Sequence, residues 1–370
     1  MEKDGTDAGG GPGALPGTPG PPDRAAAAAG ESPGETEEKY PVPAHGARAE
    51  HRRETSPVDT ARFTSFKQRV TENCAKVIVG KEDVVEQIII CLIASGHILL
   101  EDLPGMGKTM LLRAFAKSIG SDFKRIQFTP DLMPSDLTGI HFYNQKQGEF
   151  EFRPGPLFTN LVLADEINRA TPRSQSALLE VMEEKQISVD GTSYPMEEPY
   201  MVMATQNPVE SFGTFPLPEA QMDRFFMRLS LGYMTREQEI GVMRREDSKV
   251  IVAALPQVVT AEELMVLRAE FPQVTVSDET AGYIMDLVEY TRRSALLTCG
   301  VSTRGTLALY RASQIAAALD GRDYVIPEDV KKEAAAVLPH RLTVIQDSHL
   351  SAGKLVANML EEVAVPLEKL

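Results

Sequence analysis

Apolar residues follow two different periods along the folded part of the chain. Phe63, Phe66, Val70 and Cys74 recur every three or four residues, which predicts one face of a helix, and a second helix is expected over residues 81–94. Short apolar runs indicate buried strands at residues 97–101, 123–128, 161–165 and 200–205. Strands that alternate with helices predict an α/β fold with a parallel sheet covered by helices on both faces.

A different alternation interrupts this α/β order. Ile140, Phe142, Phe150 and Phe152 alternate with polar residues on the two sides of a polar turn, which predicts an inserted hairpin over residues 138–153. A minimal α/β core has no such hairpin, so the insertion is a departure from the simplest fold of this class.

The pattern changes again at about residue 235, where no further strand run is visible and the apolar positions take helical spacing. Helices are expected over residues 236–245, 261–270, 278–294, 303–319 and 327–337. The sequence thus predicts a tail at 1–60, an α/β core at 61–232 and a second, all-helical domain at 233–370.

The tail differs from the rest in composition. Residues 1–60 hold 10 of the 27 glycines and 9 of the 25 prolines, with an excess of acids and few large apolar side chains. Such a segment cannot offset the entropy cost of ordering by burial, so we expect it to be disordered, or to become ordered only on a partner.

Charge and hydropathy narrow the classes of partner. The 370 residues include 38 basic and 53 acidic side chains, which gives a formal charge of −15 and a pI near 5.0. Because binding to DNA, RNA or anionic lipid relies on clustered Lys and Arg, this balance argues against such partners and leaves only a local basic channel. The longest apolar region, residues 88–100, is interrupted and shorter than the roughly 18 residues of a membrane span. With no secretory signal visible, we expect a cytoplasmic protein without direct membrane insertion.

The thiols and imidazoles show no metal pattern. Cys74, Cys91 and Cys299 lie far apart, and none forms the close pair that zinc sites or redox motifs need. We expect all three to be buried, reduced thiols. The six histidines are equally dispersed, so none is assigned to a metal.

One glycine-rich segment carries a clear chemical signal. The sequence EDLPGMGKT follows the first predicted strand and precedes a helix. There, Gly105 and Gly107 let backbone N–H groups turn toward a triphosphate at the helix N-terminus. Lys108 would reach the β and γ phosphates, and Thr109 would place its hydroxyl on Mg²⁺. Asp102 stands where the general pattern has glycine, so we expect its carboxylate to point away from the phosphates.

Polar residues end two later strands. Asp165 and Glu166 follow an apolar run, and after a phosphate loop this pair suits Mg²⁺ binding by Asp165 and general-base catalysis by Glu166. Asn207 follows the next strand and could orient the attacking water, since ligands bind at the carboxyl ends of parallel strands. Taken alone, each could equally be an ordinary turn residue.

Taken together, these motifs resemble those of the AAA+ ATPases, and within them the MoxR group. The resemblance covers roughly residues 60–345. It is carried by the stretches 99–109, 127–139, 152–156, 164–170, 175–183, 217–225 and 302–304. The loop of this group often carries an acid at the position of Asp102, which removes that departure from the pattern.

The resemblance implies further site residues. Arg224 resembles the arginine finger that reaches the ATP of a neighbouring subunit, which requires a ring. Arg304 resembles the sensor arginine that contacts the γ-phosphate from the lid domain. The segment Val79-Gly80 resembles the loop on the adenine side. The residues expected to bind nucleotide are then Val79, Gly80, Pro104, Gly105, Met106, Gly107, Lys108, Thr109 and Met110.

The resemblance also implies what the protein does. Members of this group are Mg²⁺-dependent ATPases, so the resemblance implies an ATPase that forms a hexameric ring. It also implies that the ring remodels or matures a partner protein carrying a von Willebrand factor A domain. The hairpin at 138–153 resembles an insertion that lines or approaches the central pore in related rings. Three alternatives stay open: a nucleotide-gated binding switch with slow hydrolysis, a chelatase-like role, and a nucleic-acid motor, the last disfavoured by the charge.

Overall fold

The computed structural model describes residues 58–102, 105–206, 213–244, 248–345 and 350–366. Of the tail predicted at 1–60, all but residues 58–60 lie outside this described part.

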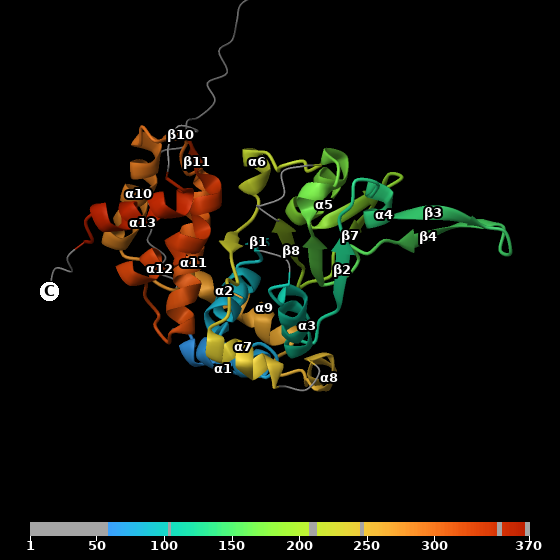
Figure 1. Cartoon of the computed structure of the whole chain (residues 1–370), viewed down its shortest axis with the longest axis horizontal. Helices are drawn as coiled ribbons and strands as arrows, with labels where there is room; N and C mark the ends of the chain where they lie inside the picture. The colour runs from blue at the N-terminus through green and yellow to red at the C-terminus, as the bar shows by residue number, and fades with distance from the viewer. Residues whose placement is uncertain (1–57, 103–104, 207–212, 245–247, 346–349, 367–370) are drawn as a thin grey trace, which may run out of the picture. The chain divides into compact units, whose positions relative to one another are not determined.

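A five-stranded parallel sheet forms the α/β core (Figure 1). In spatial order its strands are β2 (Phe123–Gln127), β5 (Leu161–Asp165), β8 (Met201–Gln206), β1 (Ile98–Glu101) and β9 (Met227–Leu229). Four of them lie where the apolar runs predicted strands. The fifth, β9, was not predicted, because a run of three residues with an arginine in the middle carries no strand signal. The α/β class with a parallel sheet is confirmed.

Helices cover both faces of the sheet and pack there against alternating strand residues. The helices of the core are α1 (Thr60–Ala75), α2 (Glu82–Ile93), α3 (Lys108–Ser118), α4 (Pro134–Thr138), α5 (Pro172–Glu184) and α6 (Glu219–Met222). Leu99 belongs to the apolar cluster that contains Leu178 of α5, whereas its neighbours Ile98 and Leu100 belong to the cluster on the other face. Side chains on a strand alternate between faces, so β1 contributes to both clusters.

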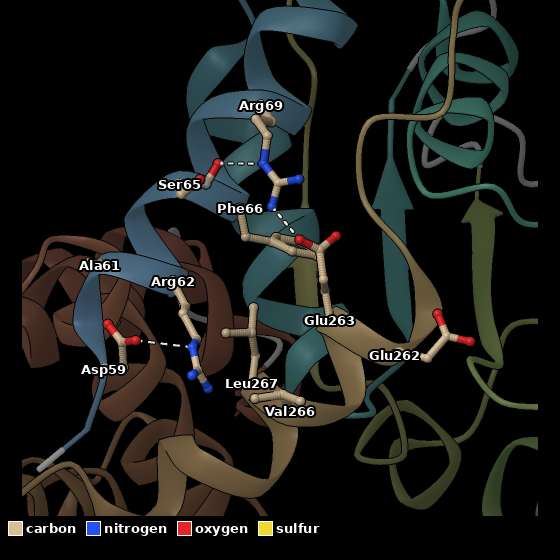
Figure 2. Close-up of a pocket in the computed structure, with 10 residues that line it drawn as sticks. All are labelled: Asp59, Ala61, Arg62, Ser65, Phe66, Arg69, Glu262, Glu263, Val266 and Leu267. Atoms are coloured by element: carbon tan, nitrogen blue, oxygen red, sulfur yellow. Dashed lines mark hydrogen bonds and ion pairs between the residues drawn. The ribbon is translucent and has the colours of Figure 1, made fainter.

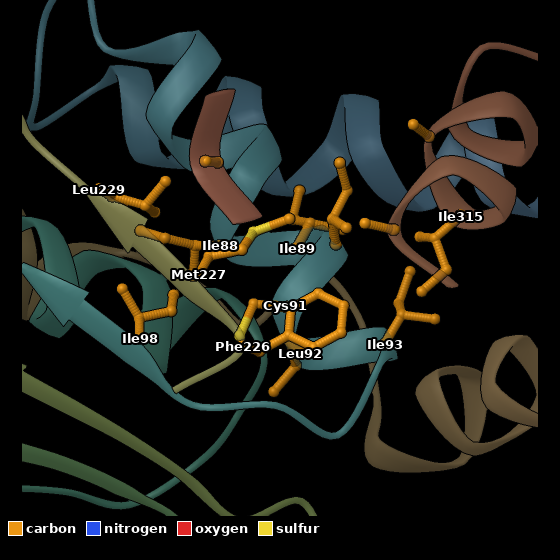
Figure 3. Close-up of a cluster of buried hydrophobic side chains, with 14 of the residues drawn as sticks. Ile88, Ile89, Cys91, Leu92, Ile93, Ile98, Phe226, Met227, Leu229 and Ile315 are labelled. Atoms are coloured by element: carbon orange, nitrogen blue, oxygen red, sulfur yellow. The ribbon is translucent and has the colours of Figure 1, made fainter. Parts of the chain in front are cut away.

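The second half of helix α2 is buried on all sides. Its residues from Ile88 to Ile93 are apolar and fully buried, whereas Glu82 and Asp83 in the first turn are exposed. Figure 3 shows Ile88 close to Met227 of β9 and Ile93 close to Ile315 of α11 (Thr303–Leu319). This helix therefore joins the sheet to the C-terminal helices in one apolar core.

The chain after β9 is predominantly helical. Its helices are α7 (Arg236–Met243), α8 (Ser248–Ala254), α9 (Ala261–Glu270), α10 (Asp278–Arg293), α11, α12 (Pro327–Val337) and α13 (Ala352–Glu362). The predicted bounds of α9, α11 and α12 agree with those observed. One expectation for this part is wrong: it does contain strands, the short antiparallel pair β10 (Leu297–Cys299) and β11 (Thr343–Val344). Two and three residues are too few to show an alternating pattern.

The inserted hairpin is confirmed, and a second hairpin accompanies it. The first is formed by β3 (Gly139–Asn144) and β4 (Glu149–Pro154), and the second by β6 (Gln186–Val189) and β7 (Thr192–Pro195). The ring of Phe152 stacks on that of Tyr194 with centroids 4.5 Å apart, and His141 Nδ1 lies 2.8 Å from Asp190 Oδ2. The two hairpins are thus joined by side chains, and the first extends beyond the sheet in Figure 1.

Thiol burial and membrane spans complete the comparison with the sequence. Cys74 and Cys91 are buried as expected, but Cys299 is exposed, because β10 lies on the surface. Burial raises the pKa of the Cys74 thiol to about 11, so this group stays protonated. Within the ranges that the structure describes, every helix is too short or too polar to cross a membrane.

Candidate nucleotide site

The glycine-rich loop leaves β1 and ends at the first turn of α3. Gly105 and Gly107 have φ angles of +85° and +86°, a conformation that glycine adopts without strain. A Cβ atom added at Gly105 would meet no heavy atom within 4 Å, so the space above the loop is open. Gly107 caps α3, whose unpaired N-terminal amides therefore face this space.

A cavity of about 340 Å³ lies over this loop. Six residues of the predicted nucleotide set line it: Gly105, Met106, Gly107, Lys108, Thr109 and Met110. The ammonium group of Lys108 donates a hydrogen bond to the backbone carbonyl of Asp102, 3.1 Å away. Pro104, which belongs to the predicted set, lies outside the described residues.

Asp102 also lines this cavity, but its carboxylate is bound by the chain after β9 and points away from the loop, as expected. Its side chain is 6% exposed, and its carboxylate accepts hydrogen bonds from Ser230 Oγ at 2.7 Å and from the backbone N–H of Leu231 at 2.9 Å. A third bond comes from the N–H of Gly232 at 3.2 Å. The ammonium group of Lys81 donates to the carbonyls on the other side of this segment. The phosphate loop is therefore tied to the chain that leaves β9.

Asp165 and Glu166 lie in the same cavity, at the carboxyl end of β5. Thr205 Oγ1 donates to Asp165 Oδ1 at 2.7 Å and accepts from the N–H of Glu166 at 2.8 Å. Glu166 has a φ of +57°, which is uncommon for a residue with a side chain and is frequent at functional sites. One hydroxyl of β8 thus fixes both members of the acidic pair.

Strand β2 supplies partners that the sequence did not reveal. Arg125 Nε donates to Asp165 Oδ2 at 3.0 Å, and Gln127 Nε2 donates to Glu166 Oε2 at 2.6 Å. We expected β2 to be a buried strand, which is wrong: it is the edge of the sheet, and Lys124, Arg125 and Gln127 are exposed. The polar residues Lys124, Arg125 and Gln127 in the sequence of this strand could have indicated its exposed position.

The donor set fits Mg²⁺ bound with a nucleotide. The hydroxyl of Thr109 and the carboxylate of Asp165 line one cavity, and both are hard oxygen ligands. In the described part of the chain, no group of three or more His, Cys, Asp or Glu side chains could hold a metal. Few protein ligands suit an ion that is coordinated mainly by phosphate and water. Asn207, the predicted water-orienting residue, lies outside the described ranges.

The segment Val79-Gly80, predicted to lie on the adenine side, adjoins the loop without lining this cavity. A Cβ atom at Gly107 would lie 3.9 Å from Ile78 Cδ1, so the chain next to Val79 reaches the phosphate loop. Gly80 has a φ of +67° and faces Gln238 of α7, whose amide would overlap any Cβ placed there. Val79 and Gly80 therefore lie between the loop and α7, and are absent from the cavity lining.

The two predicted arginines lie together near the amino ends of the strands, opposite the phosphate loop at their carboxyl ends. Arg224 precedes β9, which runs parallel to β1, and the N–H of the following Phe226 bonds the carbonyl of His97 at 2.8 Å. Arg224 is thus at the amino end of these strands, whereas the phosphate loop leaves the carboxyl end. Strands of this length separate the two edges by about 10 Å. Arg304 lines the same second cavity as Arg224, of about 500 Å³.

A third cavity, of about 620 Å³, contains none of the predicted residues (Figure 2). It lies between the start of α1 and α9, and its lining combines Phe66 and Leu267 with charged side chains. In Figure 2, Arg69 points toward Glu263, and Arg69 Nη2 lies 2.7 Å from Glu263 Oε1. The opposed charges are paired with each other, so nothing in this cavity resembles the phosphate site.

A glycine loop at a helix N-terminus, with an acidic pair at the carboxyl end of another parallel strand of the same sheet, defines a nucleotide-binding P-loop protein of the α/β class. Comparison with known proteins agrees. Residues 97–227 match the profile of the ATPase family associated with various cellular activities (AAA), and residues 289–362 match that of the AAA lid domain.

Relatives place the chain more narrowly. It is 46% identical to uncharacterized protein YeaC of Bacillus subtilis over 304 residues, which cover 81% of this chain and 95% of that protein. It is 38% identical to chaperone MoxR1 of Mycobacterium tuberculosis, over 81% of this chain and 82% of the relative. A crystal structure of a protein from Cytophaga hutchinsonii superposes with a TM-score of 0.76 at 38% identity, over 83% of this chain and 97% of that one. The chain belongs to the MoxR-type AAA+ ATPases.

Proposed function

We propose that this protein is a Mg²⁺-dependent ATP hydrolase that acts as a ring-forming, chaperone-like factor in the remodelling or maturation of a partner protein. The observation that carries the hydrolytic part is the cavity in which the phosphate loop meets Asp165 and Glu166. A protein that only binds nucleotide has no need of a second acid held over the phosphate position.

Each predicted site residue has a role in this proposal. The amides around Gly105, Met106 and Gly107 and the ammonium group of Lys108 bind the β and γ phosphates, with Pro104 and Met110 completing the loop. Thr109 and Asp165 would hold Mg²⁺, which would supply positive charge against the phosphates when bound. Glu166 takes the proton of the attacking water, and Asn207 orients that water. Val79 and Gly80 border the adenine.

The arginines support assembly into a ring. Arg224 and Arg304 lie near the amino ends of the strands, away from their own phosphate loop. Neither is therefore positioned for the nucleotide of its own subunit. A head-to-tail contact brings that edge of one subunit to the phosphate loop of the next, and such contacts close into rings. We propose a hexamer in which both arginines stabilise the transition state in the neighbouring site.

The client side of the proposal depends on the relatives and the hairpin. A relative named as a chaperone supports action on a protein, and we propose that the client carries a von Willebrand factor A domain. Ile140, Tyr143 and Phe150 on the first hairpin are exposed, Phe150 by 73%, and could contact the client. We propose that the core spans residues 61–232 and the lid residues 233–370. We also propose that the protein is cytoplasmic and does not bind nucleic acid.

The test of hydrolysis compares two variants in a phosphate-release assay. Lys108→Ala should lose ATP binding, because the β and γ phosphates lose their cation. Glu166→Gln should keep binding and lose turnover by two to four orders of magnitude, roughly the contribution of a general base. Near-normal turnover by Glu166→Gln would contradict the assignment.

The test of the client uses the stalled variant. Glu166→Gln held in ATP should retain its client during purification from the source cells, and mass spectrometry should find a von Willebrand factor A protein that is absent with Lys108→Ala. Retention of the same proteins with and without nucleotide would instead indicate binding unrelated to ATP. Retention of proteins that bind nucleic acid would point to the motor alternative.

A further inference from the structure

One carboxylate holds both arginines of the second cavity. Glu183, near the end of α5, accepts from Arg224 Nη2 through Oε2 at 3.0 Å and from Arg304 Nη2 through Oε1 at 2.6 Å. Arg224 Nη1 also donates to the carbonyl of Leu179, one turn earlier on α5. Helix α5 thus fixes Arg224, from the chain before β9, and Arg304, from the start of α11, in one place.

A second carboxylate ties the same two segments together. Asp223 precedes Arg224, and its Oδ2 accepts from the hydroxyl of Ser302 at 2.8 Å. Its Oδ1 accepts from Arg341 Nε at 2.8 Å, and the Arg341 side chain is 2% exposed. Since Ser302 caps α11, Asp223 fixes the start of that helix beside the Arg224 segment. The two carboxylates form parallel ties between segments far apart in the chain.

The positive charges of Arg224 and Arg304 explain why these two side chains need a carboxylate between them. Two guanidinium groups in one cavity repel each other, and long side chains lose considerable rotamer entropy when they are held in place. A carboxylate between them offsets the repulsion and fixes both planes. Each guanidinium has five N–H donors, and the contacts above use two of Arg224 and one of Arg304. Donors remain for a phosphate that enters the cavity.

We propose that Glu183 is a positioning residue that holds Arg224 and Arg304 as one rigid pair for the γ-phosphate of a neighbouring subunit, with Asp223 fixing the segments that carry them. This inference rests on the proposed ring, and it adds a specific requirement: the finger and the sensor arginine act together. Separating them lowers turnover even when both arginines are present.

The experiment measures ATP turnover, KM and nucleotide affinity of the full-length chain carrying Glu183→Gln. Turnover should fall at least about tenfold, the scale at which outer partners of a working group act. The affinity of the phosphate loop for a fluorescent ATP analogue should stay unchanged, because that loop lies at the other edge of the sheet. The matched control is Glu184→Gln, an exposed neighbour on the same helix, which should retain wild-type turnover.

A double-mutant cycle separates positioning from general damage. If Glu183 acts through the arginines, Glu183→Gln should cost less turnover in an Arg224→Ala background than in the wild-type chain, because only Arg304 remains to be displaced. An additive loss would overturn the inference, and so would wild-type turnover or turnover faster than wild type in the single variant. Thermal unfolding midpoints and the mass of the assembly show that the variant is folded and assembled.

The outcomes also distinguish this inference from the proposal beneath it. Normal turnover by Arg224→Ala refutes the proposed finger, whatever Glu183→Gln does. Loss of turnover by Arg224→Ala with normal turnover by Glu183→Gln leaves the finger in place and refutes only the positioning role.

Discussion

The most quantitative prediction concerns a buried carboxyl group between α2 and α12. Glu333 is 0% exposed, and its Oε1 accepts from Gln87 Nε2 at 3.0 Å. Its other oxygen and Gln87 Oε1 are buried without a hydrogen-bond partner. A proton on Glu333 Oε2 would let the acid donate to Gln87 Oε1, so that both groups are satisfied in a cyclic acid and amide pair.

Electrostatics agree with that protonation. Burial raises the pKa of Glu333 from its ordinary 4.5 to about 7, against the lowering effects of the Gln87 hydrogen bond and Lys332. Glu86 and Asp329 nearby raise the pKa further by like-charge repulsion. Between pH 4.5 and 7 the folded state therefore holds a proton that the unfolded state has lost. Stability from this group is fully present at low pH and is lost as pH rises toward 7.

Glu333→Gln removes this pH dependence because an amide is neutral throughout and can pair with Gln87 in the same way. A tenfold change in proton affinity corresponds to about 1.4 kcal/mol. The free energy of unfolding of the variant, relative to wild type, should therefore rise by about 3 kcal/mol between pH 4.5 and 8. At pH 8 the variant should be the more stable protein.

The assay is urea denaturation at several pH values from 5 to 8, with the difference between variant and wild type as the readout. This difference cancels the pH dependence of all other groups. Glu328→Gln, at an exposed position on the same helix, is the control and should follow the wild-type profile. A constant difference across the range, or a variant less stable than wild type at pH 8, would refute the reasoning.

Three further predictions concern the nucleotide site. Asp102→Ala leaves three donors of the 230–232 segment unpaired, so it should lower the free energy of unfolding by about 2–4 kcal/mol, as measured by denaturation. It should also weaken ATP binding, as measured by titration with a fluorescent nucleotide. Unchanged affinity would contradict the tie between this segment and the phosphate loop. Gly107→Ala places a side chain at a φ of +86° and should cost about 1–2 kcal/mol of stability even though its Cβ meets no close atom. Thr205→Val removes the hydroxyl that fixes Asp165 and Glu166, so steady-state kinetics should show kcat falling with little change in KM; the reverse pattern would mean that this hydroxyl serves binding.

The elements that the sequence predicted are those with local signals. Helices α9 and α11 begin where Thr260 and Ser302 cap them, and α12 begins at Pro327. The first residues of these helices can therefore be predicted from the local sequence. The phosphate loop is likewise a contiguous motif. Strand β9 and the pair β10 and β11 are too short for a period to be visible, and their pairing depends on distant neighbours.

The same distinction holds for the site. Lys108, Thr109, Asp165 and Glu166 were predicted from motifs, and the structure brings them into one cavity. The partners that fix them come from other strands and carry no motif. Glu183 and Arg304 are 121 residues apart, and only the fold, which brings the start of α11 to the end of α5, makes one the partner of the other.

The central claim is that ATP is hydrolysed between subunits, and one mixing experiment tests it directly. Glu166→Gln and Arg224→Ala rings should each be inactive in phosphate release. Mixed and reassembled at equal amounts, they should regain activity, because an Arg224→Ala subunit has an intact Glu166 that the Arg224 of a Glu166→Gln neighbour can serve. About a quarter of the head-to-tail interfaces in such a mixture are complete. Activity near that share of wild type is the predicted result; mixed rings as inactive as their parents, or an active Arg224→Ala ring, would contradict the account.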